Sequence, residues 1–381
     1  MTEKMRDGII QRGKTWSYVV REKDPATGKT KPRWVGGFPT RTAAKRARDE
    51  ARNAVNRGTY VAPQTLTVAD WLSTWISAHE VELKPSTADT YRKNIDRYLI
   101  PTIGHERVQA LSPSHLSIVF RKMAESGGQG GKPLSGRTVD FARAVLRRAM
   151  QDAILERIIE VNPVVGTKRP RQVKPKHTTW TGSQLQTFLD QVQDDRLFPL
   201  WALASATGMR RGELCGLQWD DVDLEAAVVS IERSTTQIGN DRVTSTPKNH
   251  ERRRVQIDAR TVATLRTWRK AQAEERLQWG AAYEDTEGLM FTRENGTPIL
   301  PNYVTKLFGK RQTSAGLARL TVHELRHTHA TILLRAGVPV HIVAKRLGHK
   351  DPSVTLNVYA DVIPEDDGYA VDTFTQAVWG A

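Results

Sequence analysis

Residues 320–361, which read LTVHELRHTHATILLRAGVPVHIVAKRLGHKDPSVTLNVYAD, bring several chemically reactive side chains close together in the chain. His323 and Arg326 stand one helical turn apart, so a helix would project both from one face. His349 follows Gly348 at a predicted helix end, and Tyr359 stands in the next segment. Two imidazoles, a guanidinium and a phenol in this order indicate a site that holds an anionic group and attacks it. A buried face behind them is predicted from apolar residues at helical spacing: Leu325, Ile332, Leu333, Val338, Ile342, Val343 and Leu347.

Two further motifs lie upstream. Residues 206–214, ATGMRRGEL, place Arg210 after a Thr-Gly step and Glu213 three residues later. Residues 246–249, TPKN, contain Lys248 and are followed by the run RRRV. Taken singly, such residues are usually solvated or structural, and it is their joint order and spacing that point to a catalytic site.

Together these motifs resemble the signature of the tyrosine recombinase (phage integrase) family. The runs HELRHT, LGH and NVYAD resemble its C-terminal half, and the two upstream motifs resemble its first arginine box and its lysine hairpin. The resemblance implies cleavage of DNA through a 3′-phosphotyrosine intermediate with a free 5′-hydroxyl. That hydroxyl then attacks a partner strand's phosphotyrosine and releases the tyrosine, so the bond energy is conserved and no ATP is required. No cofactor or metal is expected, because no P-loop lysine motif and no carboxylate cluster typical of two-metal nucleases appears. The implied catalytic residues are Arg210, Lys248, His323, Arg326, His349 and the nucleophile Tyr359, with Glu213 and His327 in support.

These residue types suit that chemistry. The guanidinium forks of Arg210 and Arg326 match the non-bridging oxygens of a phosphodiester and can stabilise the charge of its transition state. Tyr359 has an ordinary pKa of about 10, so it needs deprotonation or a positive field to act as a nucleophile. His323 and His349 can accept its proton or hydrogen-bond the phosphate. Lys248 can protonate the departing 5′-oxygen.

The bulk properties limit the class of protein. A chain of 381 residues is expected to form two or three domains. Its net charge of +15 and isoelectric point near 10.0 imply a polyanionic partner. Nucleic acid is favoured over an anionic membrane, because no basic amphipathic helix with aromatic anchors stands out. With 39% hydrophobic residues, a mean hydropathy of −0.50 and no signal-peptide core, we expect a cytoplasmic, nucleoid-associated protein. The single cysteine, Cys215, excludes an intramolecular disulfide and is expected in the core.

The predicted fold class is multidomain α+β. A basic sheet-plus-helix module over residues 1–60 resembles the arm-type DNA-binding domain of integrases, and an all-α core-binding domain is expected over 65–162. A basic linker over 163–180 precedes a mainly α catalytic domain with a small antiparallel sheet over 181–363. The tail, 364–381, is expected to exchange between protomers. The residues predicted to contact DNA outside the catalytic set are Arg33, Arg41, Lys168, Arg169, Arg171 and Lys174.

Local patterns predict individual elements. Alternation predicts strands over 15–20 and 33–38 with a short third strand near 8–11, and Thr40 is expected to cap a helix that runs to Asn56. Ser86 is expected to cap a helix that Pro101 stops. Residues 243–246 and 253–257 are expected to pair as a hairpin.

The function expected from these features is site-specific recombination that integrates and excises a phage or mobile element. The expected partners are double-stranded DNA attachment sites, a homotetramer of the chain on that DNA, and an excisionase or DNA-bending host factor. Two alternatives stay open: a DNA-relaxing enzyme of the type IB topoisomerase kind, and a DNA-binding regulator without catalysis. The basic front module favours the integrase over the topoisomerase, and the complete set of six matched residues argues against a silent regulator.

Overall fold

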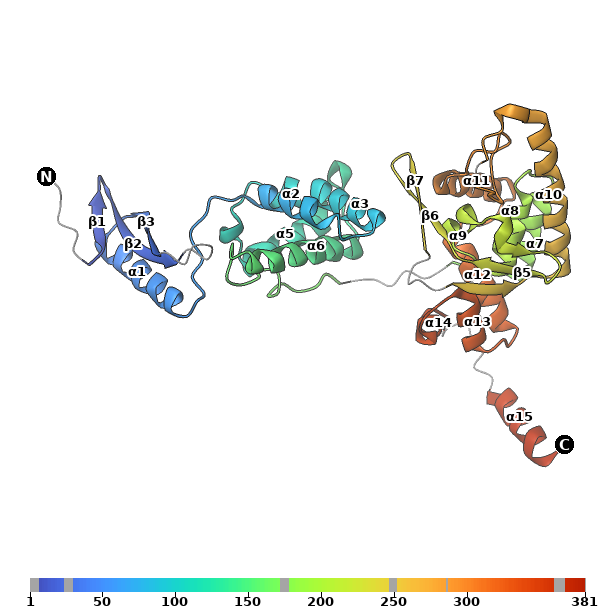
Figure 1. Cartoon of the computed structure of the whole chain (residues 1–381). Coiled ribbons are helices and arrows are strands. Elements are labelled where there is room, and N and C mark those ends of the chain that lie inside the picture. Colours follow the sequence, from blue (N-terminus) through green and yellow to red (C-terminus); the bar gives the residue numbers. More distant parts are fainter. Residues whose placement is uncertain are drawn as a thin grey trace. The chain divides into compact units, whose positions relative to one another are not determined.

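The structure, a computed structural model, describes residues 7–23, 30–171, 178–246, 252–285, 287–359 and 367–380. The chain divides into two compact units, residues 1–174 and residues 175–381, and its elements are labelled in Figure 1. In the part of the chain that is described, no helix combines the length and the apolar character needed to cross a membrane.

The N-terminal module is a three-stranded antiparallel sheet with one helix. Its strands are β1 (Ile9–Arg12), β2 (Thr15–Lys23) and β3 (Thr30–Phe38), in the order β1-β2-β3, and the helix is α1 (Arg41–Asn56). Thr40 caps α1 by accepting a hydrogen bond from the Ala43 amide, as its sequence position predicts. The apolar sides of sheet and helix close on a small core of Ile9, Tyr18, Val20, Ala44 and Ala51.

The rest of the first unit is helical. Its elements are α2 (Val68–His79), α3 (Pro85–Asn94), α4 (Ile100–Ile103), α5 (Pro113–Ser126) and α6 (Gly136–Leu155). Two tryptophans of α2 join it to α6, because the Trp71 indole donates to the Ala149 carbonyl (3.1 Å) and that of Trp75 donates to Asp152 (2.7 Å). Their rings belong to one continuous apolar core, which makes this bundle a folding unit of its own.

Two expectations for α3 are wrong. The helix begins at Pro85, with Lys84 as its N-cap, so Ser86 lies inside the first turn. Proline suits the first helical position because its missing N–H needs no partner there. Pro101 does not stop the helix either, since a π-helical turn over Ile95–Leu99 leads into α4, which ends at Gly104. The wider turn accommodates the hydrogen bond that Pro101 cannot donate.

The segment after α6 is partly folded. Val164 and Thr167 are buried, and the buried Arg143 side chain of α6 donates to the Thr167 hydroxyl (2.8 Å) and carbonyl (3.1 Å). At the other end of the expected linker, Trp180 is 1% exposed and donates to the Thr328 hydroxyl through its backbone and to the Ala318 carbonyl through its indole. Val164, Thr167 and Trp180, at the two ends of the predicted linker, therefore pack against the folded units that the linker joins.

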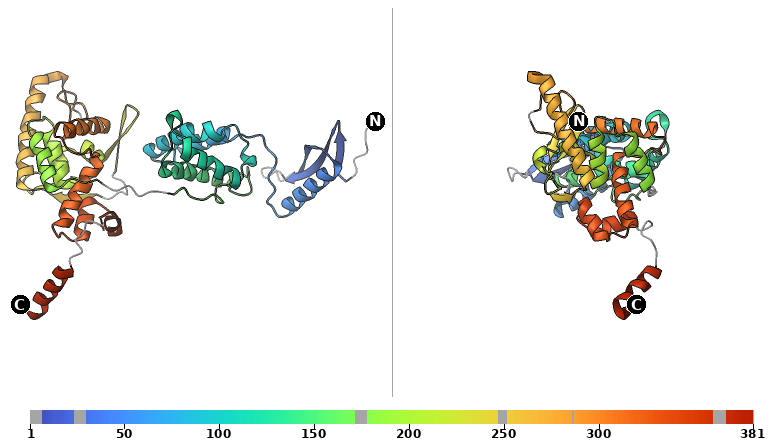
Figure 2. Two further views of the ribbon diagram at one scale, coloured as in Figure 1. Left: turned by 180° about the vertical axis from the view of Figure 1, so that it is seen from behind. Right: turned by 90° about the vertical axis from the view of Figure 1, so that its right-hand side faces the viewer.

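The second unit is mainly helical, as predicted. Its helices are α7 (Gly182–Gln191), α8 (Phe198–Thr207), α9 (Arg211–Gly216), α10 (Ala259–Trp279), α11 (Pro301–Ser314), α12 (Val322–Arg335), α13 (Val340–Leu347), α14 (Pro352–Tyr359) and α15 (Asp367–Trp379). Four aromatic side chains (Trp180, Phe188, Trp201 and Phe308) form the centre of its main core, with ring centroids 5.2–6.2 Å apart. The view from behind shows α10 along the outer edge of this unit (Figure 2).

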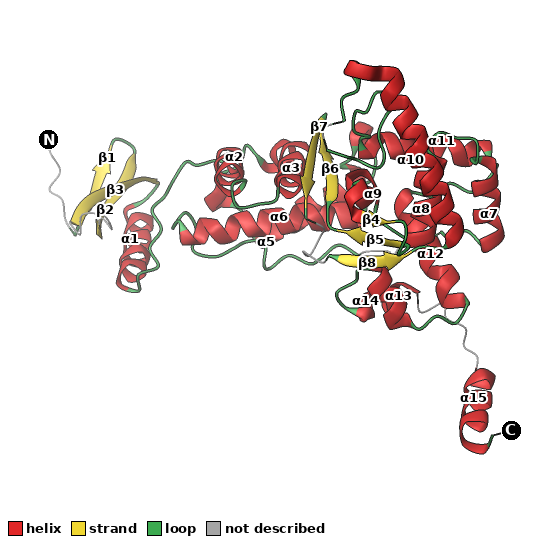
Figure 3. Cartoon of the chain, turned by 45° about the vertical axis from the view of Figure 1, so that its right-hand side comes forward, coloured by secondary structure: helices red, strands yellow, loops and turns green. Residues whose placement is uncertain are grey.

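The second unit contains two small antiparallel sheets. One has the order β4-β5-β8, built from β4 (Val222–Asp223), β5 (Val228–Ile231) and β8 (Arg253–Gln256), and the other pairs β6 (Ser234–Ile238) with β7 (Asp241–Ser245). Figure 3 shows the first sheet between the helices α8 and α10 on one side and α13 and α14 on the other. Together with the N-terminal module, these elements confirm the multidomain α+β class.

The hairpin expected between residues 243–246 and 253–257 is wrong. β7 pairs with β6 across the two-residue turn Gly239-Asn240, and β8 pairs with β5, with Val255 opposite Val229. A glycine with φ of +60° closes the tight β6–β7 turn at little steric cost. Pairing β8 with β5 instead buries the two valines in the core.

The predicted apolar face of residues 320–361 is confirmed in part, because Ile332, Leu333 and Val338 are only partly buried. Leu325, Val343 and Leu347 are at most 1% exposed, whereas Ile342 is 49% exposed. Ile342 and Val343 are consecutive residues of α13. Consecutive side chains of a helix point in different directions, so Ile342 cannot face the same core as Val343.

Candidate active site

The first arginine box lies at the junction of α8 and α9. α8 ends at Gly208, whose φ of +63° turns the chain sharply, and Arg210 is the N-cap of α9. The Glu213 carboxylate accepts a hydrogen bond from the Arg210 backbone N–H (2.8 Å) and another from Arg210 Nη1 (2.8 Å). One carboxylate therefore fixes both the backbone and the side chain of Arg210.

Arg326, the second arginine of the predicted site, lies near the N-terminal end of α12. Thr321 and Glu324 form a capping box that starts this helix, which places Arg326 two residues after Glu324. Arg326 is 2% exposed, and its Nη1 donates to the Gly208 carbonyl (2.8 Å) while its Nη2 donates to the Leu347 carbonyl (2.6 Å). Arg326 thus joins the end of α8, the N-terminal part of α12 and the end of α13.

His349 meets the two arginines at the end of α13. Gly348 ends that helix with φ of +69°, its carbonyl accepts a hydrogen bond from Arg210 Nη2 (3.3 Å), and His349 Nε2 lies 3.0 Å from Arg326 Nη2. Burial and the positive charges of Arg326, Arg210, Arg253 and His323 lower the pKa of His349 to about 4. The imidazole is therefore neutral at pH 7.

Glu213 is the buried anion of the site. It is 1% exposed, and Arg253 of β8 binds both carboxylate oxygens (Nη2–Oε2 2.6 Å, Nη1–Oε1 3.0 Å). Burial by itself raises the pKa of Glu213, but the hydrogen bonds and charges of Arg253 and Arg210 outweigh it and bring the pKa to about 2. Glu213 stays ionised at neutral pH and holds two guanidiniums in place.

Two glycines permit these close approaches. A Cβ at Gly208 would lie 2.8 Å from His329 Cδ2, and a Cβ at Gly348 would lie 2.9 Å from the Arg253 side chain. Both positions also have positive φ, which favours glycine. Glycine is therefore favoured at positions 208 and 348 of the motifs for two reasons: there is no room for a Cβ, and the backbone has a positive φ.

The structure describes the other predicted site residues to different extents. His323 is an exposed residue of α12, and its ring meets the buried His327 ring edge-on, with the centroids 4.8 Å apart. Tyr359 is the last residue of α14, and its side chain lies outside the described part of the chain. Lys248 also lies outside the described residues.

The predicted DNA-contacting residues are exposed where they are described. Arg33 of β3 donates to the Pro63 carbonyl (2.9 Å), and Arg41 is the first residue of α1. Lys168, Arg169 and Arg171 are exposed, with Arg169 lying 3.8 Å from Asp140 of α6. Lys174 lies outside the described residues.

Two cations that hold the site together, Arg253 and Arg346, were not identified from the sequence motifs. Arg253 binds Glu213 and also donates to the Arg346 carbonyl (3.1 Å). Arg346 in turn donates to the Ala206 carbonyl (2.7 Å), the Gln256 carbonyl (3.0 Å) and His329 Nε2 (3.2 Å). A signal for Arg253 existed, because strand alternation places it on the same side as the buried Val255, where a cation needs a partner.

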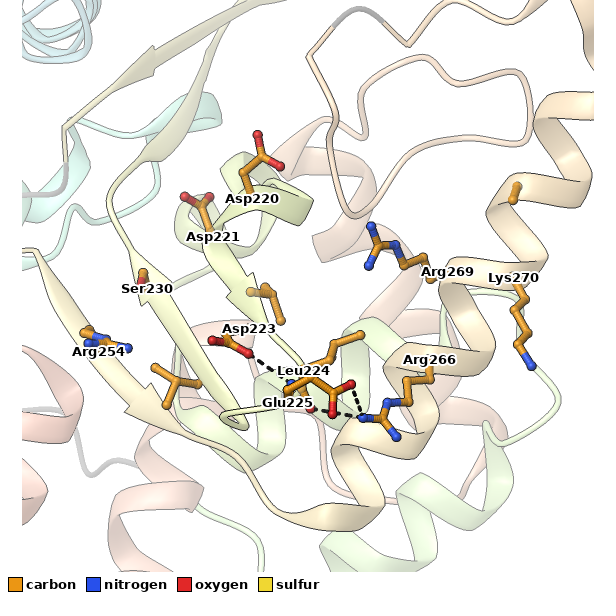
Figure 4. A pocket seen from close by; sticks show the side chains of 13 residues that line it. Asp220, Asp221, Asp223, Leu224, Glu225, Ser230, Arg254, Arg266, Arg269 and Lys270 are labelled. Carbon is orange, nitrogen blue, oxygen red and sulfur yellow. Dashed lines mark hydrogen bonds and ion pairs between the residues drawn. The ribbon is translucent and has the colours of Figure 1, made fainter.

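An open pocket of about 820 Å³ lies elsewhere in the second unit, between the β4-β5-β8 sheet and α10. Figure 4 shows Arg266 and Arg269 of α10 on the side of the helix where Asp220, Asp221, Asp223 and Glu225 lie, with Lys270 on the other side of the helix. Arg266 binds Glu225 at 2.7 Å, and both side chains are at least half exposed. The described residues that line this pocket include none of the six predicted catalytic residues, and their charges are of both signs, which does not favour an anion site.

The geometry of the arginine cluster suits an oxyanion. Two guanidiniums, from α9 and α12, converge on the end of α13, and the Arg210 side chain keeps 26% of its surface exposed. Each fork offers five N–H donors, so such a pair matches the tetrahedral oxygens of a phosphate.

Three family profiles match the chain. Residues 179–365 match the phage integrase family, residues 67–122 match the N-terminal SAM-like domain of phage integrases, and residues 9–55 match an arm DNA-binding domain. The chain is 28% identical over 354 residues to a "Tyrosine recombinase XerC-like" protein of Caldanaerobacter subterraneus subsp. tengcongensis, covering 88% of this chain and 89% of that protein. It is 23% identical over 296 residues to the ICEBs1 integrase of Bacillus subtilis, covering 77% and 78%.

Solved structures share the fold. The Tn1549 transposon integrase in complex with transposon right end DNA superposes with a TM-score of 0.64 at 20% identity, covering 82% of this chain and 99% of that one. A lambda integrase dimer bound to a COC′ core site gives a TM-score of 0.56 at 16% identity, covering 93% and 95%. The matched profiles, the relatives and the converging arginines agree, and this chain belongs to the phage integrase family of tyrosine recombinases.

Proposed function

We propose that this chain is a site-specific DNA recombinase that cleaves and rejoins strands to integrate and excise a phage or mobile element. The observation that carries the proposal is the hydrogen-bonded cluster that joins Arg210, Glu213, Arg326 and His349 across three helices, α9, α12 and α13. Such a cluster supports binding of a scissile phosphate, because its donors are held in position before substrate arrives.

In the proposed reaction, Arg210 and Arg326 bind the non-bridging oxygens of the phosphate. Tyr359 attacks the phosphorus, forms a 3′-phosphotyrosine bond and releases a 5′-hydroxyl, which Lys248 protonates as it leaves. His323 and His349 are proposed to accept the tyrosine proton or hydrogen-bond the phosphate. For His349 this uses Nε2, which accepts from Arg326 in the DNA-free chain and would exchange that partner for the substrate. Attack of a partner strand's 5′-hydroxyl on the phosphotyrosine then restores the DNA backbone and the free phenol.

Glu213 and His327 are proposed to support this machinery. Glu213 holds Arg210 in place through two hydrogen bonds and balances its charge. His327 is 7% exposed and packs against the His323 ring, which limits the orientations open to that imidazole.

The other segments are proposed to bind DNA and to assemble protomers. Residues 1–60 act as an arm-type DNA-binding domain, residues 65–162 as a core-binding domain, residues 163–180 as a basic linker and residues 181–363 as the catalytic domain. The tail, residues 364–381, docks on a neighbouring protomer. Exposed apolar side chains on α15 support this role, because a helix with such a face gains stability by burying it: Val371, Phe374, Val378 and Trp379.

The proposed partners follow from the same scheme. They are double-stranded attachment sites, a homotetramer on DNA, and an excisionase or DNA-bending host factor, in the cytoplasm of the host. The basic side chains at Arg33, Arg41, Lys168, Arg169, Arg171 and Lys174 are proposed to contact the phosphate backbone, and the excess of positive charge supports this.

The experiment uses nicked duplexes that trap covalent intermediates, tiled across the DNA that flanks the gene. The full chain is incubated with each labelled duplex in EDTA without ATP, and protein–DNA adducts are resolved on denaturing gels. We expect an adduct with the unchanged chain and none with Tyr359→Phe. Tyr303→Phe is the matched control, because Tyr303 is an exposed tyrosine of α11 in the same unit and should keep full adduct formation.

A duplex bound tightly by the unchanged chain but never converted to an adduct would overturn the proposal in favour of a DNA-binding regulator. An adduct that persists in Tyr359→Phe would also overturn it, because the nucleophile would be a different residue. Relaxation of supercoiled plasmid without joining of two partner duplexes would instead support the topoisomerase alternative.

A further inference from the structure

Thr355 has a buried hydroxyl for which the sequence motifs predict no role. It lies in α14, four residues before Tyr359, and it is 0% exposed. Its Oγ1 is 2.7 Å from Nδ1 of His349. The other ring nitrogen of His349, Nε2, is 3.0 Å from Nη2 of Arg326. One imidazole therefore connects a site arginine to the helix that ends at Tyr359.

The direction of each hydrogen bond follows from the chemistry of the groups. A guanidinium nitrogen only donates, so Nε2 of His349 accepts from Arg326 and carries no proton. A neutral imidazole then carries its single proton on Nδ1, which donates to the Thr355 hydroxyl oxygen. The low pKa of His349, about 4, agrees with a neutral ring.

We propose that Thr355 is a positioning residue, whose hydroxyl holds the His349 ring in one tautomer and orientation and couples it to α14. This inference rests on the proposed function, because the group being positioned serves phosphate binding and strand cleavage. Without the hydroxyl, Nδ1–H of His349 loses its acceptor in a buried place, and the ring is free to rotate or to exchange tautomers.

A purely structural role would predict something different. A threonine that only fills space can be replaced by valine, which has the same shape, with little effect on chemistry. A threonine whose oxygen orients an imidazole can be replaced by serine but not by valine. For metal-bound histidines, removal of the group that orients the ring through its second nitrogen typically changes metal affinity or activity by about 10- to 100-fold, and we expect an effect of this size for His349.

The first arm of the test measures single-turnover adduct formation by the full chain on a nicked duplex, at saturating protein. We expect Thr355→Val to slow adduct formation by about 10- to 100-fold and Thr355→Ser to stay within about threefold of the unchanged chain. DNA affinity, measured for each variant combined with Tyr359→Phe, should change by less than about threefold. Thr292→Val is the control, because Thr292 of the same unit is buried, its hydroxyl accepts a hydrogen bond from Gln272 of α10 rather than from a member of the cluster, and the variant should leave the rate unchanged.

The second arm does not require activity. The full chain is labelled with ¹⁵N-histidine, and the ring nitrogens of His349 are identified by their loss in His349→Gln. At pH 7 the unchanged chain and Thr355→Ser should show a protonated Nδ1 and an unprotonated Nε2. In Thr355→Val this pattern should be lost or exchange-broadened, while the other histidine signals and the far-ultraviolet circular dichroism stay unchanged.

The outcomes separate the two proposals. A valine variant that cleaves at the unchanged rate and keeps the Nδ1-protonated pattern would overturn the role of Thr355. If the serine and valine variants lose activity equally, the hydroxyl by itself does not account for the effect of Thr355, and the inference also fails. If the unchanged chain forms no adduct on any duplex yet shows the expected nitrogen pattern, the proposed function fails while the His349–Thr355 link stands.

Discussion

Replacement of Glu213 by glutamine tests the electrostatic centre of the site. The substitution keeps the shape of the side chain and removes one charge from a group that is 1% exposed. Four hydrogen bonds from Arg253 and Arg210 converge on the Glu213 carboxylate, at distances of 2.6–3.0 Å. An amide has one acceptor oxygen and one donor nitrogen, so glutamine must present N–H groups to at least one guanidinium that also only donates.

The magnitude follows from the pKa. A folded-state pKa of about 2 against an ordinary value of 4.5 means that ionisation of Glu213 stabilises the folded chain by about 3 kcal/mol at pH 7. Because the folded-state pKa is depressed, this stabilisation is complete well above pH 4.5 and is lost as the pH falls from there through about 2. We therefore expect Glu213→Gln to cost about 3 kcal/mol at pH 7, and the difference from the unchanged chain to shrink to about 2 kcal/mol near pH 3.5.

The assay is urea unfolding of the full chain at several pH values, followed by circular dichroism. Glu225→Gln is the matched control, because Glu225 forms an ion pair with Arg266 in which both side chains are at least half exposed, and such pairs contribute about 0–1 kcal/mol. The reasoning is refuted if Glu213→Gln and Glu225→Gln cost the same at pH 7, or if the cost of Glu213→Gln does not depend on pH.

Two further predictions concern the same unit. Gly208→Ala should destabilise the chain by at least about 1 kcal/mol more than Gly239→Ala. Both glycines have positive φ, but only at Gly208 would the new Cβ meet another side chain, His329, at 2.8 Å, so equal costs in urea unfolding would contradict the close-contact argument. Burial raises the pKa of the Cys215 thiol to about 12, so iodoacetamide at pH 8 should label it only after unfolding, as mass spectrometry can measure. Rapid labelling of the folded chain would show that Cys215 is accessible.

Local elements with strong sequence signals were predicted well. The cap at Thr40 and the helix end at Gly348 both lie where the residues indicate. Each depends on hydrogen bonds or backbone angles within a few residues, so neighbouring sequence carries enough information. The helix after Lys84 was less predictable, because serine at position 86 and proline at positions 85 and 101 offer competing signals whose balance depends on packing.

Strand pairing depended on tertiary contacts, which cannot be inferred from the order of the strands along the sequence. Residues 243–246 and 253–257 are adjacent strands in sequence, yet β7 pairs with β6 and β8 pairs with β5. The two-residue turn at Gly239-Asn240 closes β6 onto β7 locally, while Val255 gains burial only beside Val229. Alternation shows which side of a strand is apolar but does not identify its partner.

The order of motifs along the chain was sufficient to predict the family, the fold class and the set of side chains suited to phosphate chemistry, because these depend on residue type and spacing. Which groups hold those side chains was decided by the tertiary structure. Arg253 binds Glu213, which lies 40 residues away in the sequence. Arg346 donates to carbonyls that are 140 and 90 residues away, and Thr355 is hydrogen-bonded to His349 across the turn before α14. A buried charge or imidazole must have partners, but only the folded chain determines which residues supply them.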